Sequence, residues 1–212
     1  MELALPQPAG TRPLATRSLR LARRDLRAAA LRLMSVVAFL LWLVAGYVAL
    51  GYLSGNVATI VPGEAYRAGQ LGPAQIAALH REMGIASIIN LRGEHEGSPW
   101  YDAERAAAGR LGIAHYDFPI SARRELSPSD AEALIALMRT APKPVLIHCE
   151  GGADRTGLAA ALYVAAIAGG TEVEAEWHLS PVFGHAAVPG SPTWAMNASW
   201  EGMESILGIG GS

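Results

Sequence analysis

The chain has 212 residues, which is enough for one domain plus an accessory segment. Hydrophobic residues make up 51% of it, and the mean hydropathy of +0.22 is high for a soluble protein with 17% charged residues. Cys149 is the only cysteine, which excludes an intramolecular disulfide. The composition therefore indicates that apolar residues are concentrated in one part of the chain.

An apolar stretch near the N-terminus accounts for the high hydropathy. Residues 33–53 contain no charged side chain, and a helix of this length covers a hydrocarbon core of about 30 Å. We predict a transmembrane helix over these residues. A cleaved signal peptide is the alternative, but the apolar run is longer than that of a signal and no small-residue cleavage site follows it.

Charge predicts the orientation of this span. The basic N-terminal segment, residues 1–32, carries seven arginines against Glu2 and Asp25, a net charge of +5, whereas the remainder of the chain nets −7. Arginines beside an N-terminal span stay in the cytoplasm, so we expect the C-terminal part outside the cell membrane, in the periplasm of a Gram-negative cell. Because their position beside the span explains the arginines, no nucleic-acid partner is predicted.

Beyond a predicted linker at 54–63, short apolar runs alternate with helical patterns. This pattern indicates an α/β domain, placed at 64–190, in which helices flank a central, mostly parallel sheet. Strands are expected at 65–68, 86–91, 113–118 and 144–147. Helices are expected at 73–83, 100–111, 127–140, 156–168 and 172–179. Residues 191–212 are rich in Gly, Ser and Pro, and are expected to form a tail with a weak helical stretch at 200–207.

The segment 148–157, His-Cys-Glu-Gly-Gly-Ala-Asp-Arg-Thr-Gly, lies between a fully apolar strand and an apolar helix. In such a strand–turn–helix unit, backbone N–H groups converge on an anion and the helix dipole assists them. The same field favours the thiolate of Cys149, the nucleophilic form, and Arg155 can grip two phosphoryl oxygens. We predict a phosphate-binding loop made by Glu150, Gly151, Gly152, Ala153, Asp154 and Arg155.

The order Cys149, five residues, Arg155-Thr156-Gly157 resembles the active-site motif of the protein tyrosine phosphatase superfamily. It is most similar to the bacterial, dual-specificity-like branch, and residues 66–70 and 89–92 also resemble segments of that branch. The resemblance implies a phosphotyrosine phosphatase-like fold and a two-step hydrolysis through a phosphocysteine, with no metal and no cofactor. It also implies that Thr156 hydrogen-bonds the cysteine sulfur and that His148 orients the cysteine.

Three carboxyl groups are candidates for the general acid that protonates the leaving oxygen. The resemblance implies an acid about thirty residues before the cysteine, on a mobile loop. Asp117 lies 32 residues before Cys149, but it precedes a Phe-Pro pair instead of following one. Glu125, farther along the same loop, and Asp154, inside the phosphate-binding loop, are its rivals.

These features predict a membrane-anchored phosphatase that hydrolyses phosphomonoesters. Its expected substrates are phosphorylated proteins of the phosphotyrosine or dual-specificity type, or lipid and glycan phosphates of the cell envelope. Some relatives that prefer inositol lipids carry lysines where this chain has Glu150 and Ala153, so highly phosphorylated inositides are disfavoured. The alternatives are a catalytically silent, membrane-anchored phosphate-binding module and a rhodanese-like sulfur transferase, which would leave Arg155-Thr156-Gly157 unexplained.

Overall fold

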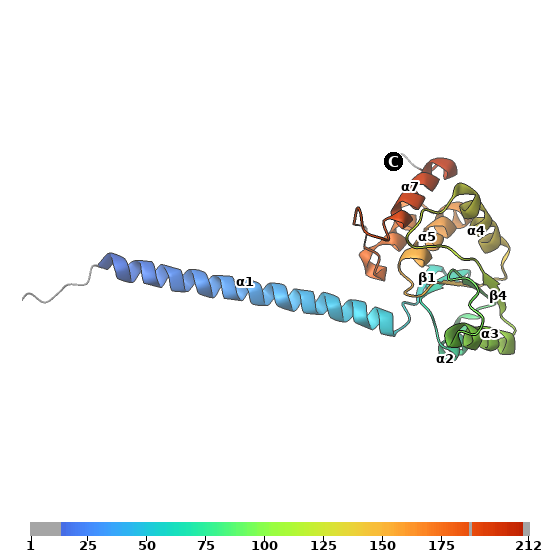
Figure 1. Cartoon of the computed structure of the whole chain (residues 1–212), viewed down its shortest axis with the longest axis horizontal. Coiled ribbons are helices and arrows are strands. Elements are labelled where there is room, and N and C mark those ends of the chain that lie inside the picture. The colour runs from blue at the N-terminus through green and yellow to red at the C-terminus, as the bar shows by residue number, and fades with distance from the viewer. Residues whose placement is uncertain (1–13, 187, 210–212) are drawn as a thin grey trace, which may run out of the picture. The chain divides into compact units, whose positions relative to one another are not determined.

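The computed structural model describes residues 14–186 and 188–209 and divides the chain into two units, Met1–Tyr47 and Val48–Ser212. One long helix, α1 (Leu14–Leu53), forms the described part of the first unit and continues into the second (Figure 1). Its segment Leu26–Gly51 has a mean hydropathy of 2.4. That length and composition are those of a membrane span, and a signal sequence shares them. The predicted span thus lies within a longer helix, and residues 1–13 of the predicted basic segment lie outside the described residues.

Five short strands form one sheet in the order β1-β2-β5-β3-β4. Their bounds are Ala58–Val61 (β1), Ala65–Ala68 (β2), Ser87–Asn90 (β3), Ala114–Asp117 (β4) and Val145–His148 (β5). Strands β2, β5, β3 and β4 are parallel to one another. The edge strand β1 pairs antiparallel with β2. The prediction of a central, mostly parallel sheet is therefore confirmed, with the most apolar strand, β5, in its middle.

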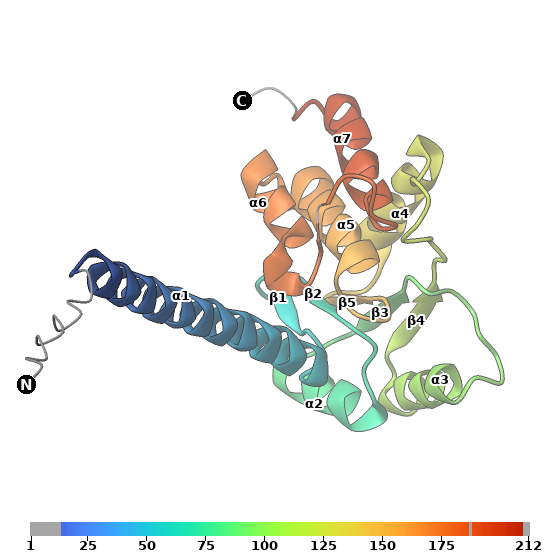
Figure 2. The same cartoon turned by 60° about the vertical axis from the view of Figure 1, so that its left-hand side comes forward.

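Helices cover both faces of this sheet (Figure 2). One face carries α2 (Pro73–Met83) and α3 (Pro99–Leu111), and the other carries α4 (Pro128–Thr140), α5 (Asp154–Tyr163), α6 (Glu172–Glu176) and α7 (Ala195–Leu207). Three short turns, η1 (Val164–Ala168), η2 (Trp177–Leu179) and η3 (Pro181–Phe183), follow α5 and α6. Successive β5 residues serve the two cores in alternation: Val145 and Ile147 pack under α4 and α5, and Leu146 packs under α2 and α3.

Two predicted boundaries are wrong. Strand β1 forms inside residues 54–63, which were expected to be a linker, because its four residues are too few to show an alternating pattern. Helix α7 forms in the expected tail, where Met196, Trp200 and Met203 are buried in the core beside α4 and α5. Tertiary burial of three large side chains stabilises this helix, which its local sequence alone indicates only weakly.

We expect Trp200→Ala to lower the free energy of unfolding by about 3–5 kcal/mol, because it removes a fully buried side chain and leaves a cavity. Ile206→Ala is the control in the same helix; its side chain is exposed, and it should change stability by less than about 0.5 kcal/mol. Thermal denaturation in detergent, followed by circular dichroism, measures both. Equal stability of the two variants would show that α7 is not part of the domain core.

Candidate active site

The phosphate-binding loop begins where β5 ends, at the edge of the sheet where the carboxyl ends of the parallel strands meet. Cys149 directly follows β5 and is only 3% exposed, and α5 begins five residues later at Asp154. Gly152 has a φ of +71°, and a Cβ there would lie 2.6 Å from the backbone nitrogen of Gly69. Only glycine fits this position, so the loop and the end of β2 are packed backbone against backbone.

All four carbonyl groups between Cys149 and α5 accept a hydrogen bond, three from outside the loop and one from the first turn of α5. The pairs are Gln70 N–H to Glu150 O (2.8 Å), Asn56 Nδ2 to Gly151 O (3.0 Å), Arg67 Nη2 to Gly152 O (2.7 Å) and Gly157 N–H to Ala153 O (2.9 Å). Three of the four donors lie within residues 56–70, around β2. The loop is therefore held by its carbonyl oxygens, from outside.

The N–H groups of the same loop are left for a ligand. Within the described residues, the backbone N–H groups from Glu150 to Ala153 make no hydrogen bond, and those of Asp154 and Arg155 make none outside α5. A run of N–H groups without partners at a helix N-terminus binds anions. We expected this loop to bind phosphate, and that use stays a prediction.

Arg67 is the central donor. The sequence did not indicate this role, because Arg67 is only one residue of the segment 66–70 that resembles the family. Its side chain is fully buried, with Nη1 donating to the Nδ1 (3.0 Å) and carbonyl oxygen (2.8 Å) of His178. Its guanidinium also stacks 3.8 Å from the ring centroid of Phe183. Burial lowers the pKa of Arg67 to about 10, although the nearby Cys149 raises it, so the guanidinium stays charged at neutral pH.

The side chains of Arg155 and Thr156 extend from the first turn of α5. Arg155 is partly buried, and its Nη1 donates a long hydrogen bond, 3.5 Å, to the carbonyl oxygen of Leu91 after β3. Thr156 is buried, and its hydroxyl donates to the carbonyl oxygen of Ala68 at 3.4 Å. Thr156 was expected to hydrogen-bond the cysteine sulfur, but its hydroxyl donates to Ala68 O instead.

His148 is held by a buried carboxylate. Its Nε2 lies 3.1 Å from Oε1 of Glu104, which also accepts from His115 Nε2 at 2.9 Å, while Gln70 donates to the other oxygen at 2.6 Å. Burial alone would raise the pKa of Glu104, but the hydrogen bonds from the two histidines lower it to about 2. The ionised Glu104 thus fixes the ring of His148, whose Nδ1 lies 3.1 Å from the carbonyl oxygen of Cys149. Glu104 was not identified from the sequence, because it lies 44 residues from His148.

The three candidate general acids have different surroundings. Both oxygens of Asp117, at the end of β4, accept hydrogen bonds, from Asn90 Nδ2 (2.8 Å) and from the hydroxyl of Tyr101 (2.7 Å). Burial and this contact with Asp117 raise the pKa of Tyr101, so the phenol remains a donor. Glu125 is exposed on the loop between β4 and α4.

Asp154 lies in the phosphate-binding loop itself and is joined to α7. Its Oδ1 is 2.7 Å from Nδ1 of the buried His185, and Nε2 of His185 is 2.8 Å from Oδ1 of Asn197. Burial lowers the pKa of His185, but the hydrogen bonds to Asp154 and Asn197 outweigh it and raise that pKa above its ordinary value. Of the three candidate acids, Asp154 is the one that belongs to the loop itself, and the structure shows that His185 and Asn197 hold it.

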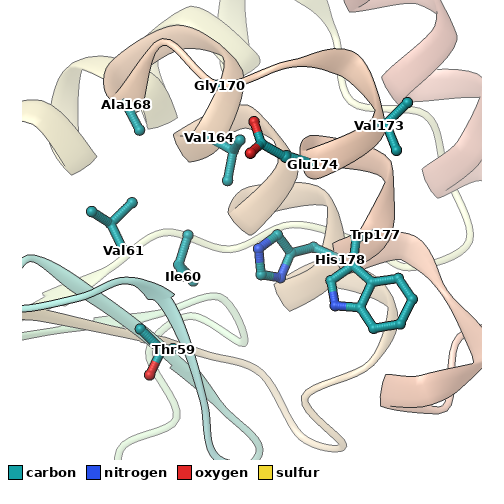
Figure 3. A pocket seen from close by; sticks show the side chains of 10 residues that line it. All are labelled: Thr59, Ile60, Val61, Val164, Ala168, Gly170, Val173, Glu174, Trp177 and His178. Carbon is teal, nitrogen blue, oxygen red and sulfur yellow. The ribbon is translucent and has the colours of Figure 1, made fainter.

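A pocket of about 250 Å³ adjoins the loop. It is lined by Gly55, Gly69, Gln70, Arg92, Trp100, Glu150 and Gly151. The guanidinium of Arg92 lies over the Trp100 ring, 3.5 Å from its centroid, and Nη1 donates to Gln70 Oε1 at 2.9 Å. A larger pocket, of about 560 Å³, lies between β1 and the segment from η1 to η2 and includes none of the loop residues (Figure 3).

Outside the loop, the described residues contain one group of carboxylates that are close enough together to hold a metal ion. Glu172, Glu176 and Glu204 place their oxygens within 4.8 Å of one another, on α6 and α7. None of them belongs to the phosphate-binding loop, so the expected metal-free reaction stays a prediction.

The contact between Arg67 and His178 predicts an effect of pH on stability. Arginine can only donate, so His178 Nδ1 must accept and the ring must be neutral. Burial, together with the charge of Arg67, lowers the pKa of His178 to about 4 from its ordinary 6.5. As the pH falls from 6.5 to 4, the unfolded chain binds a proton that the folded chain refuses, so stability is lost, by up to about 3 kcal/mol.

His178→Gln should reduce this loss, because the glutamine oxygen can accept from Arg67 and does not titrate. The measurement is the difference in Tm between pH 7 and pH 4.5 for the two proteins, since other titrating groups are common to both. An equal difference in Tm would mean that the pKa of His178 is the same in the folded and the unfolded protein.

Comparisons with known proteins were made for the sequence and for the fold. The model of the tyrosine phosphatase family matches residues 50–183. Among curated proteins, a beta-lactamase hydrolase-like protein of Xylella fastidiosa is 39% identical over 71 residues, which are 32% of this chain and 16% of that protein. The chain therefore spans only a small part of this relative's length.

Solved structures with the same fold include TpbA of P. aeruginosa and the catalytic core of Siw14 of S. cerevisiae, described as a PP-IP phosphatase. TpbA has a TM-score of 0.57 and 22% identity, over 70% of this chain and 85% of its own. Siw14 has a TM-score of 0.54 and 17% identity, over 74% of this chain and 94% of its own. The loop geometry, this shared fold and the match over residues 50–183 lead to one conclusion: the chain belongs to the tyrosine phosphatase family.

Proposed function

We propose that the protein hydrolyses phosphomonoesters through a phosphocysteine on Cys149. The observation that carries this proposal is the loop whose carbonyl groups all accept hydrogen bonds from the protein, which leaves its N–H groups to bind a phosphoryl group beside the thiol. Arg155, which makes only one long hydrogen bond, can turn toward the same group. These donors would stabilise charge on the phosphoryl oxygens in the transition state.

The reaction has two steps. The Cys149 sulfur attacks phosphorus, an S–P bond forms, and the P–O bond to the leaving group breaks as that oxygen takes a proton from a general acid. Water then attacks the phosphocysteine, the S–P bond breaks, and inorganic phosphate leaves with the thiolate restored. His148, fixed by Glu104, positions the backbone of Cys149 for both steps.

We assign the general acid to Asp154. Asp117 already uses both oxygens to accept hydrogen bonds, and Glu125 contacts nothing that would hold it over the loop, within the part of the chain that the structure describes. Asp154 has one oxygen bound to His185 and lies next to Arg155, and its side chain is partly exposed.

The substrates remain phosphorylated proteins, lipids or glycans. TpbA has been crystallised with phosphotyrosine, and Siw14 is described as acting on a PP-IP, but both likenesses are below 25% identity and extend to the fold alone. Glu150 and Ala153 offer no cation to additional phosphates, which supports singly phosphorylated substrates.

We also propose that α1 anchors the protein in the cell membrane, with the N-terminus in the cytoplasm and the phosphatase domain outside. The arginines before the apolar segment support this orientation. A reporter enzyme that works only outside the cytoplasm, fused after the last residue, should be active. Activity of a cytoplasmic reporter at the same position would reverse the orientation.

Cys149→Ser should abolish release of phosphate from an aryl phosphate by the full-length protein in detergent, with a loss of at least about 10⁴-fold, because a serine hydroxyl is not activated here. The variant should still bind inorganic phosphate, since the loop is unchanged. Turnover that survives in this variant would exclude the phosphocysteine route. Binding without turnover in the wild type would instead favour a silent phosphate-binding module.

Asp154→Asn should lower kcat by about 10²-fold on an alkyl phosphate, whose leaving oxygen needs a proton, and by much less on an aryl phosphate with a good leaving group. Glu125→Gln and Asp117→Asn are the matched comparisons, and neither should show this dependence on the leaving group. If Glu125→Gln shows it and Asp154→Asn does not, the acid is on the loop after β4.

A further inference from the structure

Asn56 joins the end of α1 directly to the catalytic loop. Its backbone N–H donates to the carbonyl oxygen of Gly51 in the last turns of α1, at 2.7 Å. Its side-chain Nδ2 donates to Gly151 O at 3.0 Å and to Phe183 O at 2.8 Å. All of these residues belong to the unit Val48–Ser212, so one residue, through its backbone and its side chain, connects the helix end, the loop and η3 within a single unit.

The backbone around Asn56 is shaped for this connection. Gly55 and Asn56 both have a positive φ, +83° and +49°, which ends the helix and turns the chain back. Asparagine tolerates this conformation better than most residues do, and its short amide reaches neighbouring backbone groups. The carbonyl oxygen of Gly55 also accepts from Gly69 N–H at 2.7 Å, which ties the same turn to β2.

Where α1 spans a membrane, this connection limits the distance between the catalytic loop and the end of the span. The apolar segment of α1 ends at Gly51, and Gly151 is separated from it by one residue and two hydrogen bonds. Those bonds span a distance on the order of 10 Å. The headgroup layer on each side of a bilayer is roughly 5–8 Å thick, so the loop would lie at the level of the lipid phosphates.

Exposed apolar side chains gather in the segment that Asn56 attaches through Phe183. Val173 is 74% exposed, Trp177 54% and Val182 40%. Exposed tryptophan is typical of the interface between water and lipid, where its ring is half buried and its N–H stays hydrated. We call Val173, Trp177 and Val182 the apolar patch.

The larger pocket lies beside this patch. Figure 3 shows Ile60 and Val61, from the strand that follows the end of α1, opposite Val164, with Trp177 at the margin. Its volume of about 560 Å³ and its mainly apolar lining, which also includes Glu174 and His178, suit part of a lipid acyl chain.

We infer that this enzyme acts on lipids of the membrane that anchors it: the catalytic loop takes the phosphomonoester headgroup, and the apolar patch and pocket take part of an acyl chain. This inference rests on the phosphatase activity proposed above. A lipid is favoured over a protein because every lipid phosphate lies at the level of the loop. A protein phosphate reaches that level only when it is attached beside a membrane segment.

The negative charge of α6 indicates which lipids would surround the enzyme. Glu172, Glu174 and Glu176 lie on α6 with Val173 and just before Trp177, and they would be repelled by an anionic surface. The natural setting is therefore a mainly zwitterionic surface that contains a minor phosphomonoester lipid. Hydrolysis breaks the P–O bond to the glycerol of that lipid and releases the alcohol and inorganic phosphate.

The test uses the full-length protein in phosphatidylcholine vesicles that contain a small fraction of phosphatidic acid, with phosphate release as the readout. A soluble aryl phosphate and a soluble phosphotyrosine peptide are assayed with the same vesicles. In one variant, a rigid helical spacer of about 30 residues between Ser54 and Gly55 lifts the loop by about 45 Å and leaves the side chain of Asn56 in place. We expect the spacer to lower lipid hydrolysis at least about 10-fold and to leave aryl phosphate hydrolysis unchanged.

A point substitution tests the apolar patch separately. Trp177→Ser should raise the KM for the lipid roughly 3-fold, and Ile206→Ser, which changes a side chain of similar exposure on α7, should not.

Three results would overturn the inference. Aryl phosphate hydrolysis without lipid hydrolysis would refute the lipid substrate and leave the phosphatase intact. A higher kcat/KM for the soluble peptide than for the lipid would indicate a protein substrate. Lipid hydrolysis that is unaffected by the spacer would refute the dependence on depth. Failure on all three substrates would instead refute the phosphatase activity itself.

Discussion

The site depends on one constraint: the carbonyl groups of the loop must be turned outward and held there. A loop of small residues would otherwise let its peptide groups rotate, and an inward carbonyl would repel a phosphate. Arg67 enforces the constraint at Gly152, where the donor is a buried cation rather than a neutral amide. Hydrogen bonds that involve a charged group are stronger than neutral ones, and losing the partner of a buried charge costs several kcal/mol. The guanidinium and the loop therefore hold each other in place.

Further features follow from burying that guanidinium. Its remaining donors need acceptors, which explains why His178 is neutral and buried and why Phe183 stacks on the cation. His178 and Phe183 belong to the segment after α6, so the same cation fixes η2 and η3 against the loop. On the other side of β5, Glu104 does the same for His148 with the opposite charge. The loop thus lies between a buried cation and a buried anion, each of which makes several hydrogen bonds.

The sequence predicts those parts of the site that are local. The strand before Cys149, the glycines after it and the helix from Asp154 lie in one continuous segment, and their order alone indicates an anion-binding loop. The sequence does not predict the residues that hold the loop. Arg67, Asn56 and Glu104 lie between 44 and 95 residues from their partners, and nothing in their local sequence indicates which strand ends meet. A buried arginine in a four-residue strand also contradicts the ordinary expectation for that residue type.

The errors in the fold have the same origin. Strand β1 exists because β2 offers it an edge, and α7 exists because the core has room for Trp200. The candidate general acids show the limit most clearly: counting residues back from Cys149 favours Asp117, and only the structure shows that both of its oxygens accept hydrogen bonds, from Asn90 and Tyr101. Spacing along the chain does not reveal whether an oxygen is already bonded.

The role of Arg67 in holding the loop is tested most directly by the affinity of the Cys149→Ser protein for inorganic phosphate. Calorimetry measures this affinity with and without Arg67→Gln. The matched control is Arg139→Gln, because Arg139 also donates to a backbone carbonyl, Ala166 O at 2.8 Å, but not in the loop. If Arg67 holds the loop open for the anion, its loss should weaken binding at least about 100-fold while the control stays unchanged. Equal affinity in a folded Arg67→Gln variant would contradict the claim that the outward carbonyl groups make the site.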